Sequence, residues 1–330
     1  MSETPLLVRD VPEEALLARI FPLLPAAPTT IVGPGDDCAV VAAPDGRYVV
    51  STDVLVEDRH FRRAWSSGYD VGWRAAVQNL ADVVSMGSRP TALVVSLVMP
   101  GDLPVDWVTG LARGLAAACT PVGAAVVGGD LSGGDQVVVA VTVHGDLEGR
   151  APVLRSGARA GDVVALAGTL GRSAAGLALL ELGRPQPELT DAYLRPDPPL
   201  RAGPLAADAG ATAMMDVSDG LLRDAGRIAR ASGVRVDLAS GALADDRRAL
   251  ADAARVVAGD GPREADVVAD GWVLTGGEDH ALLATFPAGH PLPAPFRAIG
   301  TVGEVDGAPG VSVDGAPPRH RATGWDHFGE

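Results

Sequence analysis

The sequence predicts an α+β protein with two domains, and three observations lead to this prediction. The chain has 330 residues, about twice the common size of one domain. Apolar runs of strand length alternate with longer stretches of helical period, so both kinds of element are expected. A Gly- and Arg-rich stretch over 150–162 interrupts the alternation and suggests a junction. We therefore expect one domain over 1–149 and a second over 150–330.

The composition is that of a soluble globular protein, with 47% hydrophobic and 21% charged residues. The formal charge of −15 argues against a nucleic-acid-binding surface. No segment is expected to cross a membrane, and Met1–Asp10 does not resemble a signal peptide. The two cysteines, Cys38 and Cys119, form neither a disulfide framework nor a zinc pattern. These features predict a cytoplasmic protein.

The chain contains no lysine, and all 27 basic residues are arginine. A Walker A loop, a kinase-type strand lysine and Schiff-base chemistry are therefore excluded. The many Ala, Gly and Arg residues indicate a compositional bias that explains the absence, but the exclusions hold for any cause. Phosphate chemistry in this chain would depend on Mg²⁺, arginine and backbone amides.

The first domain is predicted to begin with a short amphipathic helix over 12–24, followed by a β-hairpin. Its strands would cover 38–42 and 48–52, with a Pro-Asp-Gly turn between them. Antiparallel pairing would bring Asp36-Asp37 beside Asp53. Two carboxylates about 4 Å apart near a protein surface repel by roughly 4 kcal/mol. The hairpin therefore predicts a cation, and we expect a Mg²⁺ site that handles phosphate.

A helix over 70–86 is expected next, with Asp70 as its N-cap. Its apolar residues form one stripe, and Asp82 lies opposite that stripe with Asn79 one turn before it. Spacing alone favours a solvated polar face over a ligand-binding one. A strand over 91–98, a helix over 105–118, a buried strand over 124–127 and a strand over 136–146 complete this domain.

The buried strand over 124–127 runs into Gly128-Gly129-Asp130. A double glycine permits close approach of the backbone to a ligand, and an aspartate at the carboxyl end of a strand is a common ligand position. A plain turn that ends in aspartate explains the same residues equally well.

The second domain offers further candidates, each with a simpler alternative. The glycines of 168–176 precede a helix and suit either anion binding or close packing. Ser218 and Asp219 follow a strand that ends at Asp216, and either could simply cap the next helix. Arg155 is a candidate phosphate contact or an ordinary surface arginine. The expected elements are strands over 163–166, 214–216, 235–238, 272–274, 280–286 and 297–302, helices over 191–194, 221–230 and 244–257, and loop for most of 185–204.

Asp37, Asp53, Asp130 and Asp216 all stand at predicted strand ends. Carboxylates, together with water and phosphate oxygens, are the ligands that Mg²⁺ prefers. Several Mg²⁺ ions could therefore neutralise charge in phosphoryl transfer and take the place of lysine.

Eight motifs along the chain point to one family. They are GDDCA (35–39), STDVLVEDRHF (51–61), NLADVVSMG (79–87), GGD (128–130), RSGARAGD (155–162), DVSDGL (216–221), GGEDH (276–280) and GWDHF (324–328). In this order they resemble the thiamine-monophosphate kinases, a family of the aminoimidazole-ribonucleotide synthetase-like superfamily, over essentially the whole chain. The resemblance implies a two-domain fold with an N-terminal mixed sheet with helices that dimerises and a C-terminal α/β sandwich domain that closes one side of the active cleft.

The resemblance implies transfer of the γ-phosphate of ATP to thiamine monophosphate in a homodimer, with no side-chain base required. The acceptor is an anionic phosphate monoester, so positioning and charge neutralisation carry the reaction. The implied ATP contacts are Gly129, Asp130, Arg155 and Ser218. The implied substrate contacts are His60, Glu278 and Trp325. The implied Mg²⁺ ligands are Asp37, Ser51, Thr52, Asp53, Asp82, Asp130, Asp216 and Asp219.

Two places depart from the family pattern. Glu57-Asp58-Arg59 stands before His60, where a less charged segment is expected, and His280 replaces the aromatic residue more usual after Glu-Asp. Neither departure is expected to touch a candidate ligand. Two other functions remain open: another ATP-using enzyme of the same superfamily, and a non-catalytic regulator that binds Mg²⁺ or nucleotide.

Overall fold

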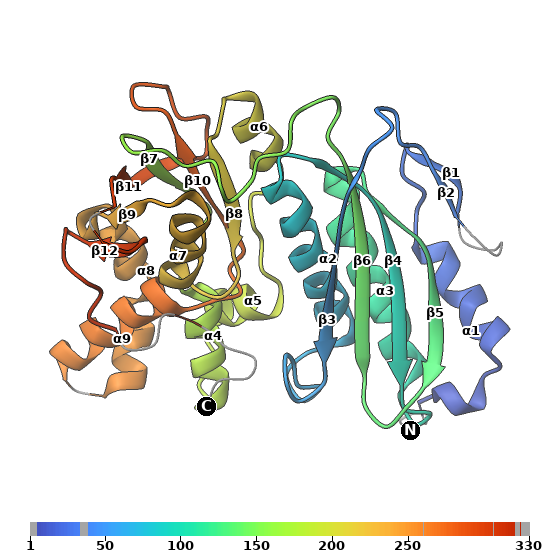
Figure 1. The fold of residues 1–330 in the computed structure, drawn as a ribbon. Helices are drawn as coiled ribbons and strands as arrows, with labels where there is room; N and C mark the ends of the chain where they lie inside the picture. The colour runs from blue at the N-terminus through green and yellow to red at the C-terminus, as the bar shows by residue number, and fades with distance from the viewer. Residues whose placement is uncertain (1–4, 34–38, 260, 306, 321–323, 325–330) are drawn as a thin grey trace. The chain divides into compact units, whose positions relative to one another are not determined.

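The computed structural model describes residues 5–33, 39–259, 261–305, 307–320 and 324. The chain forms two compact units, and each is described by itself. The first unit comprises Met1–Val83 and Ser88–Gly149, and the second comprises Val84–Gly87 and Arg150–Glu330. No helix among the described residues is long and apolar enough to cross a membrane. Helices and mixed sheets occur in both units, which confirms the predicted α+β class (Figure 1).

The first unit is built on a four-stranded sheet in the order β3-β6-β4-β5. Helices α2 and α3 cover one face of this sheet (Figure 1). On the covered face, alternate valines of β6 such as Val139 and Val141 are fully buried. The opposite, open face is left partly exposed. The elements are β3 (Val49–Val56), α2 (Gly68–Ser85), β4 (Arg89–Met99), α3 (Val105–Cys119), β5 (Ala125–Gly133) and β6 (Val138–Asp146).

The predicted hairpin is wrong. Strand β2 (Val40–Val41) pairs with β1 (Thr30–Val32), a strand that the sequence analysis did not anticipate, and not with β3. Strand β3 instead pairs antiparallel with β6 over all eight of its residues. The reason is that β6 offers a partner of matching length and alternation, whereas β2 has two residues. Asp36 and Asp37 lie outside the described residues.

Helix α2 differs from its prediction at its start and on its polar face. Ser67, and not Asp70, caps the helix: the Ser67 Oγ accepts the N–H of Asp70, and the Asp70 carboxylate accepts the N–H and O–H of Ser67. The preceding helix α1 (Glu13–Ile20) is shorter than expected. Asn79 is fully buried, so the expectation of a solvated polar face is wrong as well.

Helices α2 and α3 approach each other closely through glycines. A Cβ at Gly72 would lie 2.1 Å from the carbonyl oxygen of Leu111, and one at Gly114 would lie 2.1 Å from that of Tyr69. Gly72→Ala is therefore expected to destabilise the fold by about 1–3 kcal/mol, even though alanine is the better helix former. Thermal or urea unfolding measures this loss.

Gly133→Ala is the matched control in the same unit, because a Cβ at Gly133 meets no atom within 4 Å. It is expected to leave the unfolding transition almost unchanged. Equal stability of the Gly72→Ala variant and the wild type would show that the two helices can separate without cost.

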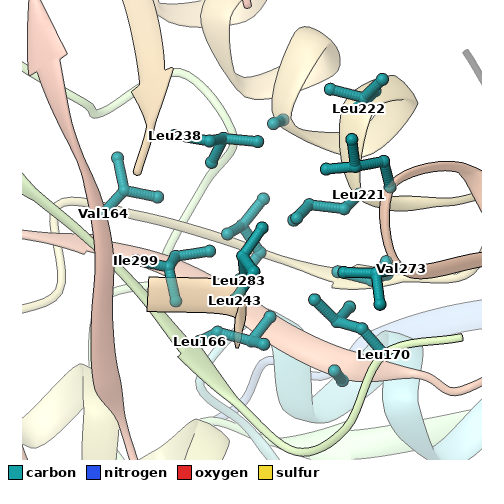
Figure 2. Packing of buried hydrophobic residues seen from close by; sticks show 14 of the residues in the cluster. Val164, Leu166, Leu170, Leu221, Leu222, Leu238, Leu243, Val273, Leu283 and Ile299 are labelled. Atoms are coloured by element: carbon teal, nitrogen blue, oxygen red, sulfur yellow. The ribbon is translucent and has the colours of Figure 1, made fainter. Parts of the chain in front are cut away.

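The second unit contains a six-stranded sheet in the order β12-β9-β11-β7-β10-β8. A large apolar core packs against it, and Leu166, Leu283 and Ile299 from three strands meet Leu221 of α7 in that core (Figure 2). The strands are β7 (Val163–Ala167), β8 (Ala213–Val217), β9 (Arg235–Leu238), β10 (Ala281–Phe286), β11 (Arg297–Gly303) and β12 (Gly310–Val313). The helices are α4 (Arg172–Glu181), α5 (Pro187–Leu194), α6 (Ala202–Asp208), α7 (Leu221–Ser232), α8 (Ala244–Ala258) and α9 (Pro262–Thr275).

Three expectations for the second unit were wrong. The segment 272–274 is the last part of helix α9 and not a strand, because three consecutive apolar residues fit either period. The Pro-rich stretch 185–204 contains α5 and the start of α6 in place of mostly loop. Strand β12 was not anticipated, and it pairs parallel with β9.

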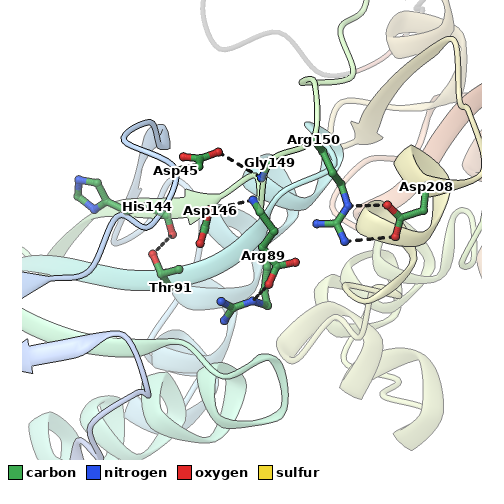
Figure 3. A network of polar contacts seen from close by, with 9 residues as sticks. Asp45, Arg89, Thr91, His144, Asp146, Gly149, Arg150 and Asp208 are labelled. Atoms are coloured by element: carbon green, nitrogen blue, oxygen red, sulfur yellow. Dashed lines mark hydrogen bonds and ion pairs between the residues drawn. The ribbon is translucent and has the colours of Figure 1, made fainter.

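Polar contacts fix the chain on each side of the change of unit at Gly149–Arg150 (Figure 3). In the first unit, the N–H of Gly149 donates to the carboxylate of Asp45. In the second unit, the Arg150 guanidinium donates to both carboxylate oxygens of Asp208, at 2.6 and 3.2 Å. The two contacts hold neighbouring residues to different units.

Candidate active-site residues

Strand β3 and helix α2 bring together several of the candidate residues in the first unit. The Ser51 Oγ donates a hydrogen bond of 2.6 Å to the Asp82 carboxylate. The N–H of Asp53 donates to the Asn79 side-chain oxygen at 3.1 Å. The polar side of α2 therefore faces β3 and not solvent, and it places oxygen ligands of the kind that Mg²⁺ prefers beside the strand.

The strand register separates these residues from Asp130. Thr52 pairs with Thr142 and Asp130 lies beside Ser96, so Thr52 and Asp130 lie on the open face of the sheet, whereas Ser51 lies on the covered face. Strands β3 and β5 are the two edges of the sheet. With neighbouring strands about 4.8 Å apart, Asp130 lies about 14 Å across the sheet from β3. Asp130 is also inside β5, and not after the end of a strand as predicted.

His60 follows β3 in a tight turn. Its Nδ1 accepts the N–H of Val56 at 2.9 Å, so the neutral ring carries its proton on Nε2. Glu57 in the same turn is buried, accepts the N–H of Val137 and forms an ion pair with Arg63. Glu57, one of the charged residues before His60, therefore has a structural role: its contacts order the turn.

A cavity of about 510 Å³ lies in the first unit between α1, α3 and strands β4 and β5. Most of the residues that line it are apolar, among them Leu111 and Leu115 from α3 and Val95 from β4. Gly129 and Asp130 line it as well, and a Cβ at Gly129 would meet the carbonyl of Val95 at 2.1 Å. The volume suits a small organic ligand.

In the second unit, the Gly-Gly-Glu-Asp-His segment lies against the end of β8. The N–H of Glu278 donates to the carbonyl of Ser218 at 2.9 Å, and a Cβ at Gly277 would lie 2.2 Å from the same oxygen. Glycine is therefore required at 277. Glu278 and His280 both have positive φ, at 70° and 52°. Strained backbone of this kind concentrates at functional sites.

His280 contacts two of the candidate residues, so the expectation that this departure touches none was wrong. Its Nδ1 lies 3.0 Å from the Asp216 carboxylate, and its Nε2 lies 3.7 Å from the Glu278 carboxylate. Burial lowers the pKa of His280, but the hydrogen bond to Asp216 and the two nearby carboxylates outweigh it and raise the pKa to about 10.

Neither Ser218 nor Asp219 caps helix α7, whose N-cap is Gly220 with no side-chain hydrogen bond. The Asp219 carboxylate instead pairs with Arg227 at 2.5 Å, and Arg227 also pairs with the fully buried Asp224 at 2.5 Å. Burial raises the pKa of Asp224 to about 7, although Arg227 lowers it. Asp224 and Arg227 were not among the predicted site residues, because their spacing along α7 is that of an ordinary helical ion pair.

The N-terminus of α4 is already occupied by a carboxylate of the chain itself. Asp279 accepts the N–H groups of Arg172 and Ser173, at 3.1 and 3.4 Å, and the O–H of Thr169. The glycines of 168–176 therefore serve close packing and an internal anion, which answers the alternative left open by the sequence. Burial raises the pKa of Asp279 to about 7, against the lowering effect of the two amides.

This pKa predicts a pH-dependent contribution to stability. The folded chain keeps the Asp279 proton up to a pH of about 7, whereas the unfolded chain releases it near 3.8. Stability from this group is therefore lost as the pH rises through that window. The Tm of the wild type should fall relative to that of Asp279→Asn as the pH rises from about 4 to about 7. A relative change of opposite sign would show that the amides outweigh burial.

One described candidate is less well placed. The side chain of Arg155 is exposed, and its carbonyl accepts the Ser232 hydroxyl. Asp37 and Trp325 lie outside the described residues, although Gly324 is described and packs on the backbone of Asp219. Among the described residues, no three His, Cys, Asp or Glu side chains gather closely enough to hold a metal ion.

Comparison with known proteins gives the family. A model of the AIR synthase related protein N-terminal domain matches residues 35–147, and a model of the C-terminal domain matches 159–259. The thiamine-monophosphate kinase of Mycobacterium tuberculosis is 49% identical over 330 residues, which is all of this chain and 95% of that protein. The chain belongs to the thiamine-monophosphate kinase family.

Solved structures of thiamine-monophosphate kinases agree with this fold. That of Aquifex aeolicus matches with a TM-score of 0.72 and 34% identity, over 84% of this chain and 90% of that one. AaThiL complexed with AMPPCP and TMP matches with a TM-score of 0.75 and 34% identity, over 89% and 91%. The family resemblance and the two-domain fold expected from the motifs are confirmed.

Proposed function

We propose that this chain is an ATP-dependent kinase that converts thiamine monophosphate to thiamine diphosphate. The observation that carries the proposal is the full-length identity of 49% to a thiamine-monophosphate kinase. A related structure, AaThiL, was solved with AMPPCP and TMP, which supports the two substrate classes. The absence of lysine is compatible with this assignment, because the candidate residues offer carboxylates, arginine and backbone amides for the phosphates.

The apolar cavity of the first unit is the proposed site for the adenine of ATP. Leu111 and Leu115 offer apolar contacts to a base, and Gly129 lines the same cavity. Asp130 at the rim would receive a Mg²⁺ ion together with the phosphates. Arg155 and Ser218 are the proposed phosphate contacts of the second unit.

The donor set fits Mg²⁺, since the proposed ligands are carboxylate and hydroxyl oxygens. Mg²⁺ usually keeps several waters and uses only one or two protein carboxylates, so a close cluster of three is not required. Bound Mg²⁺ would offset the charge that builds up on the transferred phosphoryl group. Ser51 orients Asp82 through its hydrogen bond. The proposed ligands are Asp37, Ser51, Thr52, Asp53, Asp82, Asp130, Asp216 and Asp219.

The acceptor needs no general base, because its phosphate is already anionic near neutral pH. Its positioning is assigned to His60, Glu278 and Trp325. The N–H of Val56 donates to the Nδ1 of His60, so the neutral ring carries its proton on Nε2. Glu278 and the aromatic ring of Trp325 suit the cationic thiazolium of thiamine.

We propose a homodimer formed through the open face of the first unit's sheet. Val50 and Val54 on that face are 54% and 44% exposed, which is unusual for valines in a sheet. The edge-to-edge separation of about 14 Å gives a reason for the dimer, because Asp130 cannot share an ion with Asp82 of the same chain. Because β3 is an edge of the sheet, Asp130 of the partner subunit would approach Asp82 around that edge and complete the site there.

Mass measurement by light scattering during gel filtration tests the dimer. A mass of twice 33.5 kDa supports it, and a monomer that remains active contradicts it. We also propose a cytoplasmic location, because ATP is the phosphate donor. Fractionation of cells that express the tagged chain measures the location, and recovery in the membrane fraction would refute it.

The test of the function is a ³¹P NMR assay of the purified protein with ATP and Mg²⁺, with thiamine monophosphate and free thiamine as competing acceptors. Thiamine diphosphate and ADP are the expected products. Turnover of ATP without thiamine diphosphate would favour another ATP-using enzyme of the superfamily. Binding of ATP by calorimetry with no turnover in the same buffer would favour a regulator.

A further inference from the structure

His280 lies between two carboxylates with different proposed roles. It is 3% exposed, and it stands between the Gly-Gly-Glu-Asp segment and strand β10. Its Nδ1 is 3.0 Å from the Asp216 Oδ2. Since an ionised carboxylate only accepts hydrogen bonds, this nitrogen donates. The ring thereby fixes the orientation of the Asp216 carboxylate, which is itself buried.

The other side of the same ring is turned toward Glu278. His280 Nε2 lies 3.7 Å from the Glu278 Oε2, which is beyond hydrogen-bonding distance. This ring nitrogen has no hydrogen-bond partner in the described part of the chain. A buried ring nitrogen without a partner is costly, so a small inward movement of Glu278 would be favourable. The Glu278 side chain is 36% exposed and is therefore able to meet a ligand from solvent.

The backbone fixes the ring in this place. The N–H of His280 donates to the carbonyl of Val217 at 3.1 Å, and the next residue, Ala281, pairs with Val217 in the sheet. His280 has a positive φ of 52°, and its side chain contacts Asp216 in β8. The pairing of β10 with β8 therefore fixes the backbone that carries the ring.

We propose that His280 is a positioning residue that fixes the carboxylate of Asp216 for metal binding and draws Glu278 toward the acceptor. The inference rests on the proposed kinase function and deepens it, because it joins a proposed Mg²⁺ ligand to a proposed substrate contact through one side chain. Groups that orient metal ligands typically change metal affinity by 10- to 100-fold.

Two substitutions separate the two contacts. His280→Phe keeps an aromatic ring but removes both nitrogens. His280→Asn keeps a donor near the position of Nδ1, loses the Nε2 side, and tolerates a positive φ. His320→Phe is the matched control, because it removes a His–Asp hydrogen bond of 2.9 Å, to Asp270, that involves no candidate residue.

The readouts are Mg²⁺ binding by calorimetry without acceptor, and kcat and KM for thiamine monophosphate. His280→Phe should weaken Mg²⁺ binding by about 10-fold or more and raise KM, whereas His280→Asn should restore most of the Mg²⁺ affinity and keep the raised KM. His320→Phe should match the wild type in both. Equal Mg²⁺ affinity in wild type and His280→Phe, or equal losses in His280→Phe and His280→Asn, would overturn the proposal.

Failure of the proposed function gives a different result. If the wild type forms no thiamine diphosphate, the kinase assignment fails, but the calorimetric comparison of the three variants still tests the contact with Asp216. Melting curves of all variants identify any that do not fold. If His280→Phe does not fold, the rise in melting temperature that Mg²⁺ causes is compared between His280→Asn and His320→Phe. A rise of similar size supports the proposal, and loss of the rise in His280→Asn counts against it.

Discussion

Asp82→Asn is expected to lower kcat by about 10²-fold or more, because it removes a charge that Mg²⁺ would bind while leaving the shape of the side chain unchanged. The amide oxygen of asparagine can still accept the hydrogen bond from Ser51, so the contact of 2.6 Å survives in the variant. Asp82 is half-buried on a helix that is otherwise largely buried, which restricts how far the new side chain could move. The loss should therefore be catalytic and not structural.

The measurement is the steady-state rate at increasing Mg²⁺, together with the melting temperature. Asp252→Asn is the control: its carboxylate is 86% exposed on α8 and pairs with Arg255 within the same helix. Exposed pairs of this kind contribute little, so neither rate nor stability should change. A wild-type rate in Asp82→Asn would remove this residue from the metal site.

The local patterns were sufficient to predict most of the first unit's elements. The strand expected over 91–98 is β4 (Arg89–Met99), and the helix expected over 105–118 is α3 (Val105–Cys119). Both have strong apolar periods that need no knowledge of their neighbours. The hairpin failed because the pairing of β3 depends on β6, about 90 residues later, and a local turn signal does not report on that competitor.

The candidate site was only partly accessible to sequence reasoning for the same physical reason. Spacing placed Asp82 opposite the apolar stripe of its helix, but what covers that side is β3, which is known only from the fold. His280 was noticed as a departure from the family pattern. Its contact with Asp216 spans 64 residues and exists because β8 and β10 are antiparallel neighbours, which the sequence does not reveal.

A mixed dimer of two inactive variants is expected to regain activity. If Asp130 of the partner subunit completes the site at β3, a dimer of one Asp130→Asn chain and one Asp82→Asn chain has one site with both carboxylates and one with neither. Random mixing would give half mixed dimers, so the unsorted mixture should have about a quarter of the wild-type activity and the purified mixed dimer about half. Each variant alone should be inactive.

The same experiment excludes a site built from one chain. If Asp130 and Asp82 of the same chain acted together, every site in the mixed dimer would lack one carboxylate, and mixing would restore nothing. The strand order favours recovery, because two strands lie between β3 and β5 and a separation of about 14 Å is too long for one ion to bridge. Co-expression of the two variants with different tags, purification through both tags and assay of the mixed dimer distinguish these arrangements. No recovery in a stable mixed dimer would mean that Asp130 serves a separate ion in its own chain.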